Sequence, residues 1–519
     1  MHFDVLIKGG IVVDGSGQRP AFPADVGIAG DKIVAVGRIE GAPAAEVIDA
    51  AGKVVSPGFI DVHVHSEIAL LGGPHRYGGL LQGVTTHLLA PDGFGWAPLP
   101  PDLGRQMWSY TLFAYGEANL NVDWPTPEAY LSLFPGNTPA NVVPQVPHCA
   151  VRLAVMGWEP RPATEAELEA MKRITRQWME AGAVCLCLGL DYQPSAFATT
   201  EELIELAKVV REYGGVYAAH IRNNALGKVG AWRETMQIGE GANIPVHISH
   251  EFVTPVTEPL LEEAAQRCDL TFESYMYPAG CTHLTLLLPL WAQAGGNEAL
   301  RRRLKVPEDR RRMVEALDAV LAQRAALGGD VVMAANQTGR YIGRGIVELA
   351  RELNMGLGEL AVQLLEEEDP YALMVMHHGG TPEDHRTMIE KTIQHPRMMV
   401  ASDGIYHGPH GHPRGYGCFA RVLRLCVREM QAVSLEEAVY KMSGFPAERF
   451  RIKDRGLLRP GYAADIVIFD PETVADRSTW EEPWLEPVGI DRVLVNGQSV
   501  VVGGRPTGAL PGRVLRPLV

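Results

Sequence analysis

Two histidines separated by a single residue, His63 and His65, end an apolar run in the segment PGFIDVHVHSE. Alternate residues of a β-strand lie on the same face, so both imidazoles would point the same way. Two imidazoles on one face can bind a single metal ion, although a structural histidine pair is the alternative. The pair therefore indicates metal chemistry but does not establish it.

Three further polar residues follow apolar runs of strand length: His220 in VYAAHIRN, His250 in VHISHEF and Asp403 in MMVASDGI. If these runs are parallel strands of one barrel, the residues at their carboxyl ends meet at one mouth. Imidazole and carboxylate are ligands that suit zinc, and a carboxylate beside a metal-held water can act as a general base. Together with the first pair, these residues predict a hydrolytic metal site.

The elements that would hold these residues alternate between strand and helix. TEAELEAMKRITRQWMEAGAV begins with a Thr cap and an acidic first turn, and it leads into the buried run AVCLCLGL. TTEELIELAKVVREYGG begins like a capping box and leads into VYAAHIRN. Such units predict an α/β fold with a parallel sheet, and about eight of them predict a closed, TIM-like (β/α)8 barrel.

The two ends of the chain have a different, β-type pattern. FDVLIKGGIVV near the start and ADIVIFD and DRVLVNGQSVVVGGRP near the end alternate between apolar and polar residues, with turn residues between them. We expect a small antiparallel β-sandwich domain formed from both termini, residues 1–55 and 451–519; two separate caps are the alternative. Residues 56–450 would form the barrel, with an inserted lid region near 284–336 that is too long for a loop.

The sequence resembles the amidohydrolase superfamily, and within it the N-acyl-D-amino-acid deacylase (D-aminoacylase) branch. The resemblance rests on DVLIKGGIVVDGSG, PGFIDVHVHSE, GVTTHLLAPDGFGWAP, LGLDYQP, EYGGVYAAHIRN, VHISHEF, ASDGI with HPRGYG, and RGLLRPGYAADIVIFD. These motifs occur in family order along nearly the whole chain. The resemblance implies a zinc-dependent amidohydrolase that cleaves a non-peptide C–N amide bond, with one or two zinc ions or other divalent metals.

The resemblance also implies individual roles. His63 and His65 match the pair that holds the more exposed metal, and Asp403 matches the aspartate that touches this metal and acts as the catalytic base. His220 and His250 match the ligands of the tighter metal position. Asp403 would take a proton as water attacks the amide carbonyl and return it to the leaving nitrogen.

Asp92 stands where the deacylase branch carries a bridging cysteine, because a GNCGF-like motif is replaced here by Ala90-Pro91-Asp92-Gly93-Phe94. A carboxylate can bridge two metals, as a carboxylated lysine or a glutamate does elsewhere in the superfamily. It is a harder ligand than thiolate, which favours a two-metal centre. The alternative is that Asp92 caps the next helix.

Substrate recognition departs from the branch at Phe252, where a lysine is usual two residues after the last metal histidine. This weighs against a free α-carboxylate substrate and favours, as an alternative, a hydrolase of a cyclic or uncharged amide, like hydantoinases and dihydroorotases. The run AVCLCLGL, however, lacks the lysine that dihydropyrimidinases carboxylate. A more remote alternative is a non-catalytic amidohydrolase-like interaction protein. Substrate contacts at the barrel mouth are expected from Tyr192, Arg222, Tyr275, His377 and Arg414.

Composition limits the partners and the cellular location that can be expected for this protein. With 47 basic and 62 acidic residues the net charge is −15, which weighs against nucleic-acid and anionic-membrane partners. Seven cysteines with no CxxC pair argue against a disulfide framework. The segment MHFDVLIKGG lacks the basic stretch and long apolar run that are typical of a signal peptide, and no apolar run approaches the ~20 residues that cross a bilayer, so we expect a soluble protein that is not exported. We therefore predict a cytoplasmic enzyme with a small-molecule amide substrate; the exact substrate and the oligomeric state, including a homo-oligomer, stay open.

Overall fold

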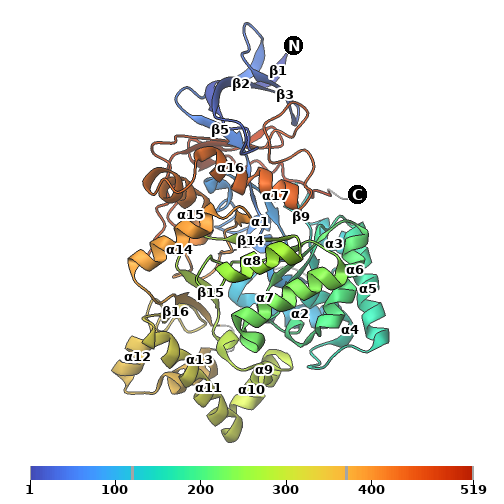
Figure 1. Ribbon diagram of the computed structural model, residues 1–519, viewed down its shortest axis with the longest axis vertical. Helices are drawn as coiled ribbons and strands as arrows, with labels where there is room; N and C mark the ends of the chain where they lie inside the picture. Colours follow the sequence, from blue (N-terminus) through green and yellow to red (C-terminus); the bar gives the residue numbers. More distant parts are fainter. Residues whose placement is uncertain (1, 119–121, 369–371, 517–519) are drawn as a thin grey trace.

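The computed structural model describes residues 2–118, 122–368 and 372–516. A barrel lies in the middle of the molecule, with a β domain at one end and a group of inserted helices at the other (Figure 1). The barrel strands are β6 (Phe59–Asp61) with β7 (Val64–His65), β8 (Val84–Leu88), β9 (Asn141–Val143) with β10 (Val146–Pro147), β11 (Cys185–Gly189), β12 (Val216–His220), β13 (Val246–Ile248), β14 (Leu270–Ser274), and β18 (Met398–Val400) with β19 (Gly404–Ile405).

These strands are all parallel and pair in chain order, and β19 pairs with β7 to close the barrel. The predicted (β/α)8 barrel is confirmed. Because the strands run the same way, the residues at their carboxyl ends gather at one mouth.

Helices follow the strands and cover the barrel wall. Their bounds are α1 (Glu67–Leu71), α2 (Pro101–Tyr115), α3 (Pro127–Leu131), α4 (His148–Met156), α5 (Glu165–Glu180), α6 (Thr200–Glu212), α7 (Asn223–Ala242), α8 (Glu258–Arg267), α14 (Pro382–Gln394), α15 (Arg414–Arg421), a π-helix (Val422–Glu429), α16 (Leu435–Met442) and α17 (Gly444–Arg449).

The capping box expected on α6 is only half formed. Thr199 accepts a hydrogen bond from the Glu202 backbone N–H, but the Glu202 carboxylate is engaged by Arg152 instead of returning to the cap. A full capping box lies on α5, where Thr164 and Glu167 satisfy each other, and another lies on α14. A long-range ion pair thus overrides the local motif on α6.

Strands from both ends of the chain lie in one nine-stranded sheet. They are β1 (Phe3–Val12), β2 (Phe22–Ala29), β3 (Lys32–Gly37), β4 (Ala44–Asp49), β5 (Val54–Pro57), β20 (Ile466–Phe469), β21 (Ile490–Val495), β22 (Gln498–Val502) and β23 (Arg505–Pro506). The link between the two ends is the antiparallel pair of β5 and β20. The expectation of a purely antiparallel sheet is wrong, because β1 pairs in parallel with β4 and with β5.

The inserted region is a small sheet with its own helices. Antiparallel strands β15 (Ala279–His283), β17 (Leu373–His377) and β16 (Asp330–Ala335) carry α9 (Leu290–Gln293), α10 (Gly296–Leu304), α11 (Pro307–Ala326), α12 (Ile346–Leu353) and α13 (Leu357–Glu368). Helices occur in 284–336 as expected, but the inserted elements extend to His377. Leu317, Leu349 and Leu360 belong to a hydrophobic core that is separate from the barrel core.

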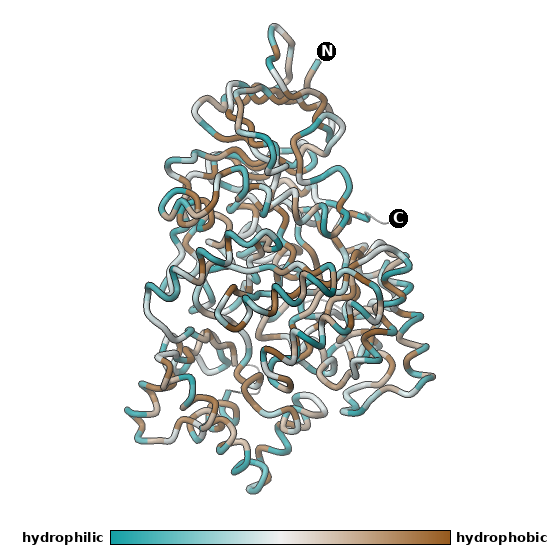
Figure 2. The backbone as a smooth tube through the Cα atoms, in the orientation of Figure 1, coloured by the Kyte–Doolittle hydropathy of each residue, from teal (hydrophilic) through white to brown (hydrophobic). Residues whose placement is uncertain are grey.

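Hydrophobic segments gather in the interior of the barrel, while the outer helices alternate between hydrophobic and hydrophilic residues (Figure 2). This alternation is typical of helices with one buried face. Within the described ranges, no helix combines the length and apolar character needed to cross a membrane.

Candidate metal centre

His63 and His65 come from the first barrel strand and face Asp92, which lies in the turn after β8. His63 Nε2 lies 3.6 Å from Asp92 Oδ1, and His65 Nε2 lies 3.6 Å from Asp92 Oδ2. All three side chains are buried. One ligand atom from each lies within 4.8 Å of the others, a separation that suits the ligands of one metal ion.

His220 at the end of β12 and His250 after β13 face Asp92 as a second pair. His220 Nδ1 and His250 Nε2 are 2.9 Å apart, and each lies 3.9 Å from Asp92 Oδ1. These three residues form another group with ligand spacing. Because Asp92 belongs to both groups, its carboxylate lies where a ligand can bridge two metal ions.

The turn that carries Asp92 presents the carboxylate inward. Asp92 has φ of 56°, a left-handed conformation that Asp adopts more readily than most residues. Its Oδ1 is buried without a hydrogen-bond partner. The alternative role as a helix cap does not fit, because the next helix, α2, begins only at Pro101. A side chain at Gly189 would approach the Asp92 carbonyl oxygen to 2.7 Å, so the glycine permits this close packing.

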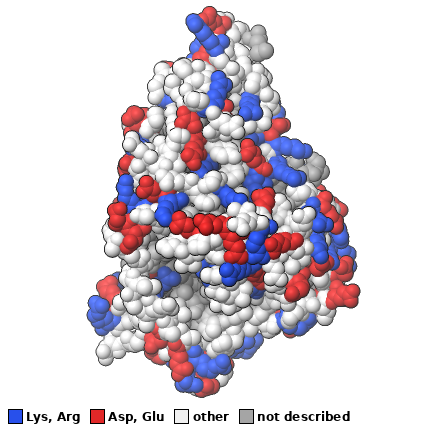
Figure 3. Space-filling model, viewed as in Figure 1, with Lys and Arg blue, Asp and Glu red and all other residues white. Residues whose placement is uncertain are grey.

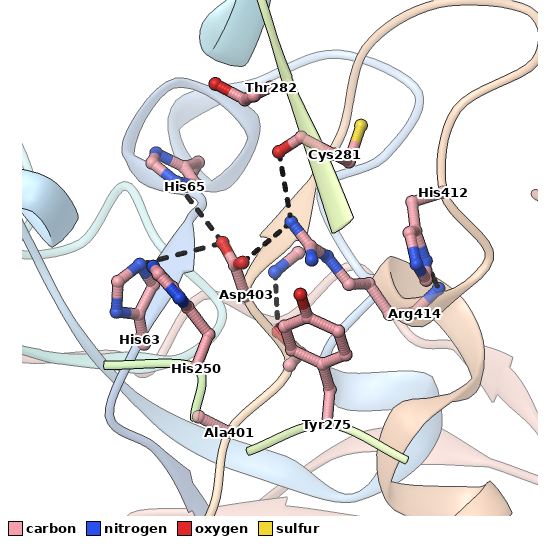
Figure 4. Close-up of polar contacts among 12 residues, drawn as sticks. His63, His65, His250, Tyr275, Cys281, Thr282, Ala401, Asp403, His412 and Arg414 are labelled. Carbon is pink, nitrogen blue, oxygen red and sulfur yellow. Dashed lines mark hydrogen bonds and ion pairs between the residues drawn. The ribbon is translucent and has the colours of Figure 1, made fainter. Parts of the chain in front are cut away.

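Asp403, between β18 and β19, lies beside the first pair of histidines (Figure 4). Its Oδ1 is 3.6 Å from His63 Nε2 and 3.5 Å from His65 Nε2, and its backbone N–H donates to the His63 carbonyl. Arg414 Nη2 lies 2.8 Å from Asp403 Oδ2. Burial alone would raise the pKa of Asp403, but Arg414 and the imidazoles hold this pKa well below its usual range. The carboxylate is therefore charged, with one oxygen turned toward the ligands.

Glu273, near the end of β14, contacts His63 on the side away from Asp92. Its Oε1 lies 3.1 Å from His63 Nδ1 and accepts a hydrogen bond from the His250 backbone N–H at 3.0 Å, while its other oxygen contacts His247. A carboxylate on the outer nitrogen of a histidine directs the other nitrogen toward a metal. His63 Nε2 is accordingly the nitrogen that faces Asp92 and Asp403.

Asp191, two residues after β11, contacts His220 of the second pair in the corresponding way. Its Oδ2 lies 3.1 Å from His220 Nε2, which leaves His220 Nδ1 to face His250 and Asp92. Sequence reasoning missed both Asp191 and Glu273. Each stands at the end of an apolar run, in AVCLCLGLD and LTFE, which is the same signal that pointed to His220.

The charges of this cluster favour a bound cation. Burial opposes a charged imidazole at His63, yet Asp92, Glu273 and Asp403 raise the pKa of His63 to about 10. Burial likewise opposes a charged Asp92, yet the imidazoles lower its pKa to about 2. His63 Nε2 and Asp92 Oδ1 are buried without hydrogen-bond partners. This set of nitrogen and oxygen donors fits zinc or a similar divalent metal.

A cavity of about 550 Å³ opens onto these groups, and Tyr192 and Tyr275 are among the residues that line it. The Tyr192 ring lies 5.0 Å from the ring of His220, and its hydroxyl lies 2.9 Å from Thr282 Oγ1. Tyr275 lies on the side of Asp403, near Arg414 (Figure 4). Both phenols therefore line the cavity close to the histidines and Asp403.

The two arginines expected at the mouth are engaged elsewhere. Arg222 Nε lies 3.0 Å from Glu234, and its Nη1 and Nη2 donate to the carbonyls of Ala196 and Ala198. It does not line the cavity, so the structure places it outside the substrate site. Arg414 is fully buried and does not line the cavity either; it holds Asp403.

His377 also lies away from the cavity. The centroid of its ring lies 4.7 Å from that of the Trp480 ring. The next residue, His378, lines the cavity instead. Burial, followed by Arg324 and other nearby basic groups, lowers the pKa of His378 to about 4, so this ring is neutral.

Comparison with known proteins covers nearly the whole chain. A family model for the Amidohydrolase family matches residues 46–253 and 307–501. D-aminoacylase of Alcaligenes xylosoxydans xylosoxydans is 35% identical over 528 aligned residues, which cover 99% of this chain and 97% of that protein.

Two solved structures have the same fold over their full length. N-acyl-D-glutamate deacylase of Bordetella bronchiseptica, complexed with zinc and a phosphonate mimic of the tetrahedral intermediate, aligns with a TM-score of 0.81 and 32% identity, covering 99% of this chain and 100% of that one. A D-aminoacylase studied for the role of its binuclear metal centre aligns with a TM-score of 0.81 and 32% identity, covering 99% of both chains.

Proposed function

The chain belongs to the amidohydrolase family, and from that membership we propose that it is a metal-dependent N-acyl-D-amino-acid deacylase. The observation that carries the proposal is the carboxylate of Asp92, which two ligand groups share beside Asp403. The proposed ligands of one metal are His63, His65, Asp92 and Asp403, and those of the other are Asp92, His220 and His250. One or two zinc ions, or other divalent metals, are the proposed cofactors.

A bound ion of this kind supplies Lewis acidity toward the amide carbonyl and lowers the pKa of water toward ~7. Asp403 supplies the proton transfer. Its Oδ1 accepts a proton from the attacking water and later donates it to the leaving nitrogen, so one carboxylate acts first as base and then as acid. Arg414 occupies Oδ2 and so keeps Oδ1 directed at the reaction. The products are a carboxylic acid and a free amine.

A second candidate, a hydrolase of a cyclic or uncharged amide, is favoured by one residue. Phe252 lines the cavity and packs edge-on against Tyr275 and His378, so this part of the barrel wall offers no cation to a substrate carboxylate. A deacylase substrate carries a carboxylate next to the amide bond that is cleaved, whereas the substrate of the second candidate carries no charge there.

A substrate panel separates these candidates. Zinc-loaded enzyme is assayed with N-acetyl-D-amino acids, their L-enantiomers and hydantoins, with acetate release or ring opening as the readout. A deacylase releases acetate from the D-enantiomers in preference to the others. Faster turnover of hydantoins, or purified protein that binds no metal, would overturn the proposal.

We also propose the cytoplasm as the location. All seven cysteines are free, which accords with a reducing compartment.

A further inference from the structure

Within the described part of the chain, every charged side chain that lines the cavity has an oppositely charged or imidazole partner, with one exception. Asp92, Asp191 and Asp403 face imidazoles or Arg414, as described above. Lys228 Nζ lies 2.9 Å from Glu251, which also accepts a hydrogen bond from the Trp232 indole. Arg324 lines the same cavity and, among the residues that the structure describes, has no acidic partner.

Arg324 lies near the end of α11, in the inserted region. Its Nη1 donates to the His377 carbonyl at 3.3 Å, and its Nε is buried without a hydrogen-bond partner. Burial lowers the pKa of Arg324, and no acidic group opposes this effect. A partly buried cation costs free energy unless an anion joins it, so the site is arranged for one.

The surroundings of Arg324 have a positive character in a protein of net charge −15. Arg324 and Lys228 are among the basic groups that depress the pKa of His378, after burial itself. The neighbouring lining is apolar, with Phe252, Met376 and Met388. In Figure 3, acidic and basic side chains form a band across the middle of this face, and the face is hollowed below the band.

We propose that Arg324 binds a carboxylate of the substrate, so that the inserted region supplies the cation that Phe252 does not. A guanidinium presents paired donors that match the two oxygens of a carboxylate. The proposed metal ligands lie at or after the carboxyl ends of barrel strands and Arg324 lies on an inserted helix, so a substrate would be held by both parts of the molecule. The proposal rests on the deacylase function and specifies its substrate as an N-acyl amino acid whose carboxylate meets Arg324.

The test measures whether the enzyme prefers a substrate that carries a carboxylate over the matching uncharged amide. Acetate release is compared for N-acetyl-D-methionine and its primary carboxamide, and for N-acetyl-D-glutamate and N-acetyl-D-glutamine. Arg324→Met should lower the acid-to-amide ratio of kcat/KM by at least about tenfold for one pair, mainly through KM. The pair that responds identifies the carboxylate: the α-carboxylate in the first pair, or the side-chain carboxylate in the second. Arg324→Lys should retain part of the preference.

Arg340→Met is the matched control, because Arg340 lies in the same inserted region, is exposed and pairs with Glu367 at 2.8 Å. It should leave both ratios unchanged. If both ratios in folded Arg324→Met equal those of the wild type, the proposal is overturned; Arg324→Gln replaces this variant if it does not fold.

A binding measurement tests the anion site at Arg324 independently of whether the protein acts as a deacylase. Isothermal titration of zinc-loaded protein compares N-acetyl-D-methionine and N-acetyl-D-glutamate with their amides. If the wild type hydrolyses none of these compounds but binds an acid in preference to its amide, and Arg324→Met loses that preference, the anion site stands and the deacylase function fails. Equal binding of each acid and its amide by the wild type would overturn the anion site.

Discussion

Arg414 Nη2 lies 2.8 Å from Asp403 Oδ2, and this contact divides the two oxygens of the carboxylate between different tasks. Oδ2 is held by a fully buried guanidinium, whose central carbon lies 4.3 Å from the centroid of the Tyr275 ring. Oδ1 is left to face His63 and His65. Arg414 thus holds Asp403 by Oδ2, the oxygen that does not take part in the proposed proton transfer.

Replacing Asp403 with Asn should remove the base while the histidines remain. We expect kcat to fall by about 10²–10⁴-fold, since this is the usual contribution of general acid–base catalysis. Metal content, measured by inductively coupled plasma mass spectrometry, should stay near that of the wild type, because His63, His65 and Asp92 remain as ligands and an amide oxygen can replace the carboxylate oxygen. Asp476→Asn, in an aspartate that pairs with Arg421 and Arg424 away from the cavity, is the control. Near-normal turnover in Asp403→Asn would rule out this residue as the base.

Replacing Asp92 with Ala should cost metal, because one carboxylate serves both ligand groups. We expect the metal content per chain to fall by at least half, with activity falling in parallel. Asp92→Cys restores a ligand, but a softer one, and should shift the preference toward zinc over manganese. Asp102→Ala, in an exposed side chain on α2, should change neither quantity. Full occupancy in Asp92→Ala would show that Asp92 is not a ligand.

Replacing Glu273 with Gln tests the support behind His63. Loss of such an orienting carboxylate typically weakens metal binding by about 10–100-fold. Titration of the loaded enzyme with a chelator measures this change, and added zinc should recover much of the activity. Glu258→Gln, in an exposed residue of α8 that pairs with Lys391, should bind metal as the wild type does. An unchanged chelator midpoint in Glu273→Gln would contradict the orienting role.

Acid should destabilise the protein partly through His87. Burial lowers the pKa of His87 to about 3, from an ordinary value of 6.5. Because the folded pKa is the lower one, the unfolded chain binds more protons between these values, so stability is present above pH 6.5 and is lost as pH falls toward 3. Between pH 7.5 and pH 5 this residue should account for a loss of about 2 kcal/mol.

The measurement compares thermal unfolding at pH 7.5 and pH 5 for the wild type and His87→Gln, both loaded with the same metal. The fall in Tm between the two pH values should be smaller in the variant, whatever its stability at pH 7.5. His2→Gln, at an exposed position, should behave as the wild type. An equal fall in Tm for wild type and His87→Gln would mean that His87 does not titrate differently on unfolding.

The part of the site that could be predicted from the sequence came from one local rule. A polar residue after an apolar run predicted His220, His250 and Asp403, and the parallel strands do bring them together. The same rule would have selected Asp191 and Glu273, but acidic residues at strand ends are common. Their roles depend on which imidazole lies in front of them, and that is a contact between different strands.

The failures have the same origin in long-range contacts. Arg222 and Arg414 are both buried arginines, and the partner that each meets, Glu234 or Asp403, decides that neither lines the cavity. Similarly, local alternation predicted strands in the β domain, but the parallel pairing of β1 with β4 depends on the path of the chain between them. The partner of β15 in the inserted sheet, β17, follows only after five helices.

The pairing of β5 with β20 has a consequence for the order in which the protein is made. While a ribosome is still synthesising the barrel, β5 has emerged but the strand that covers its edge has not. The edge of β5 at Val54 and Val55 therefore stays unpaired until Ile466–Phe469 has left the ribosome and can pair with it. An uncovered strand edge is where chains aggregate. The β domain is thus the last part of the molecule that can be completed, and premature termination before residue 466 should yield insoluble chains.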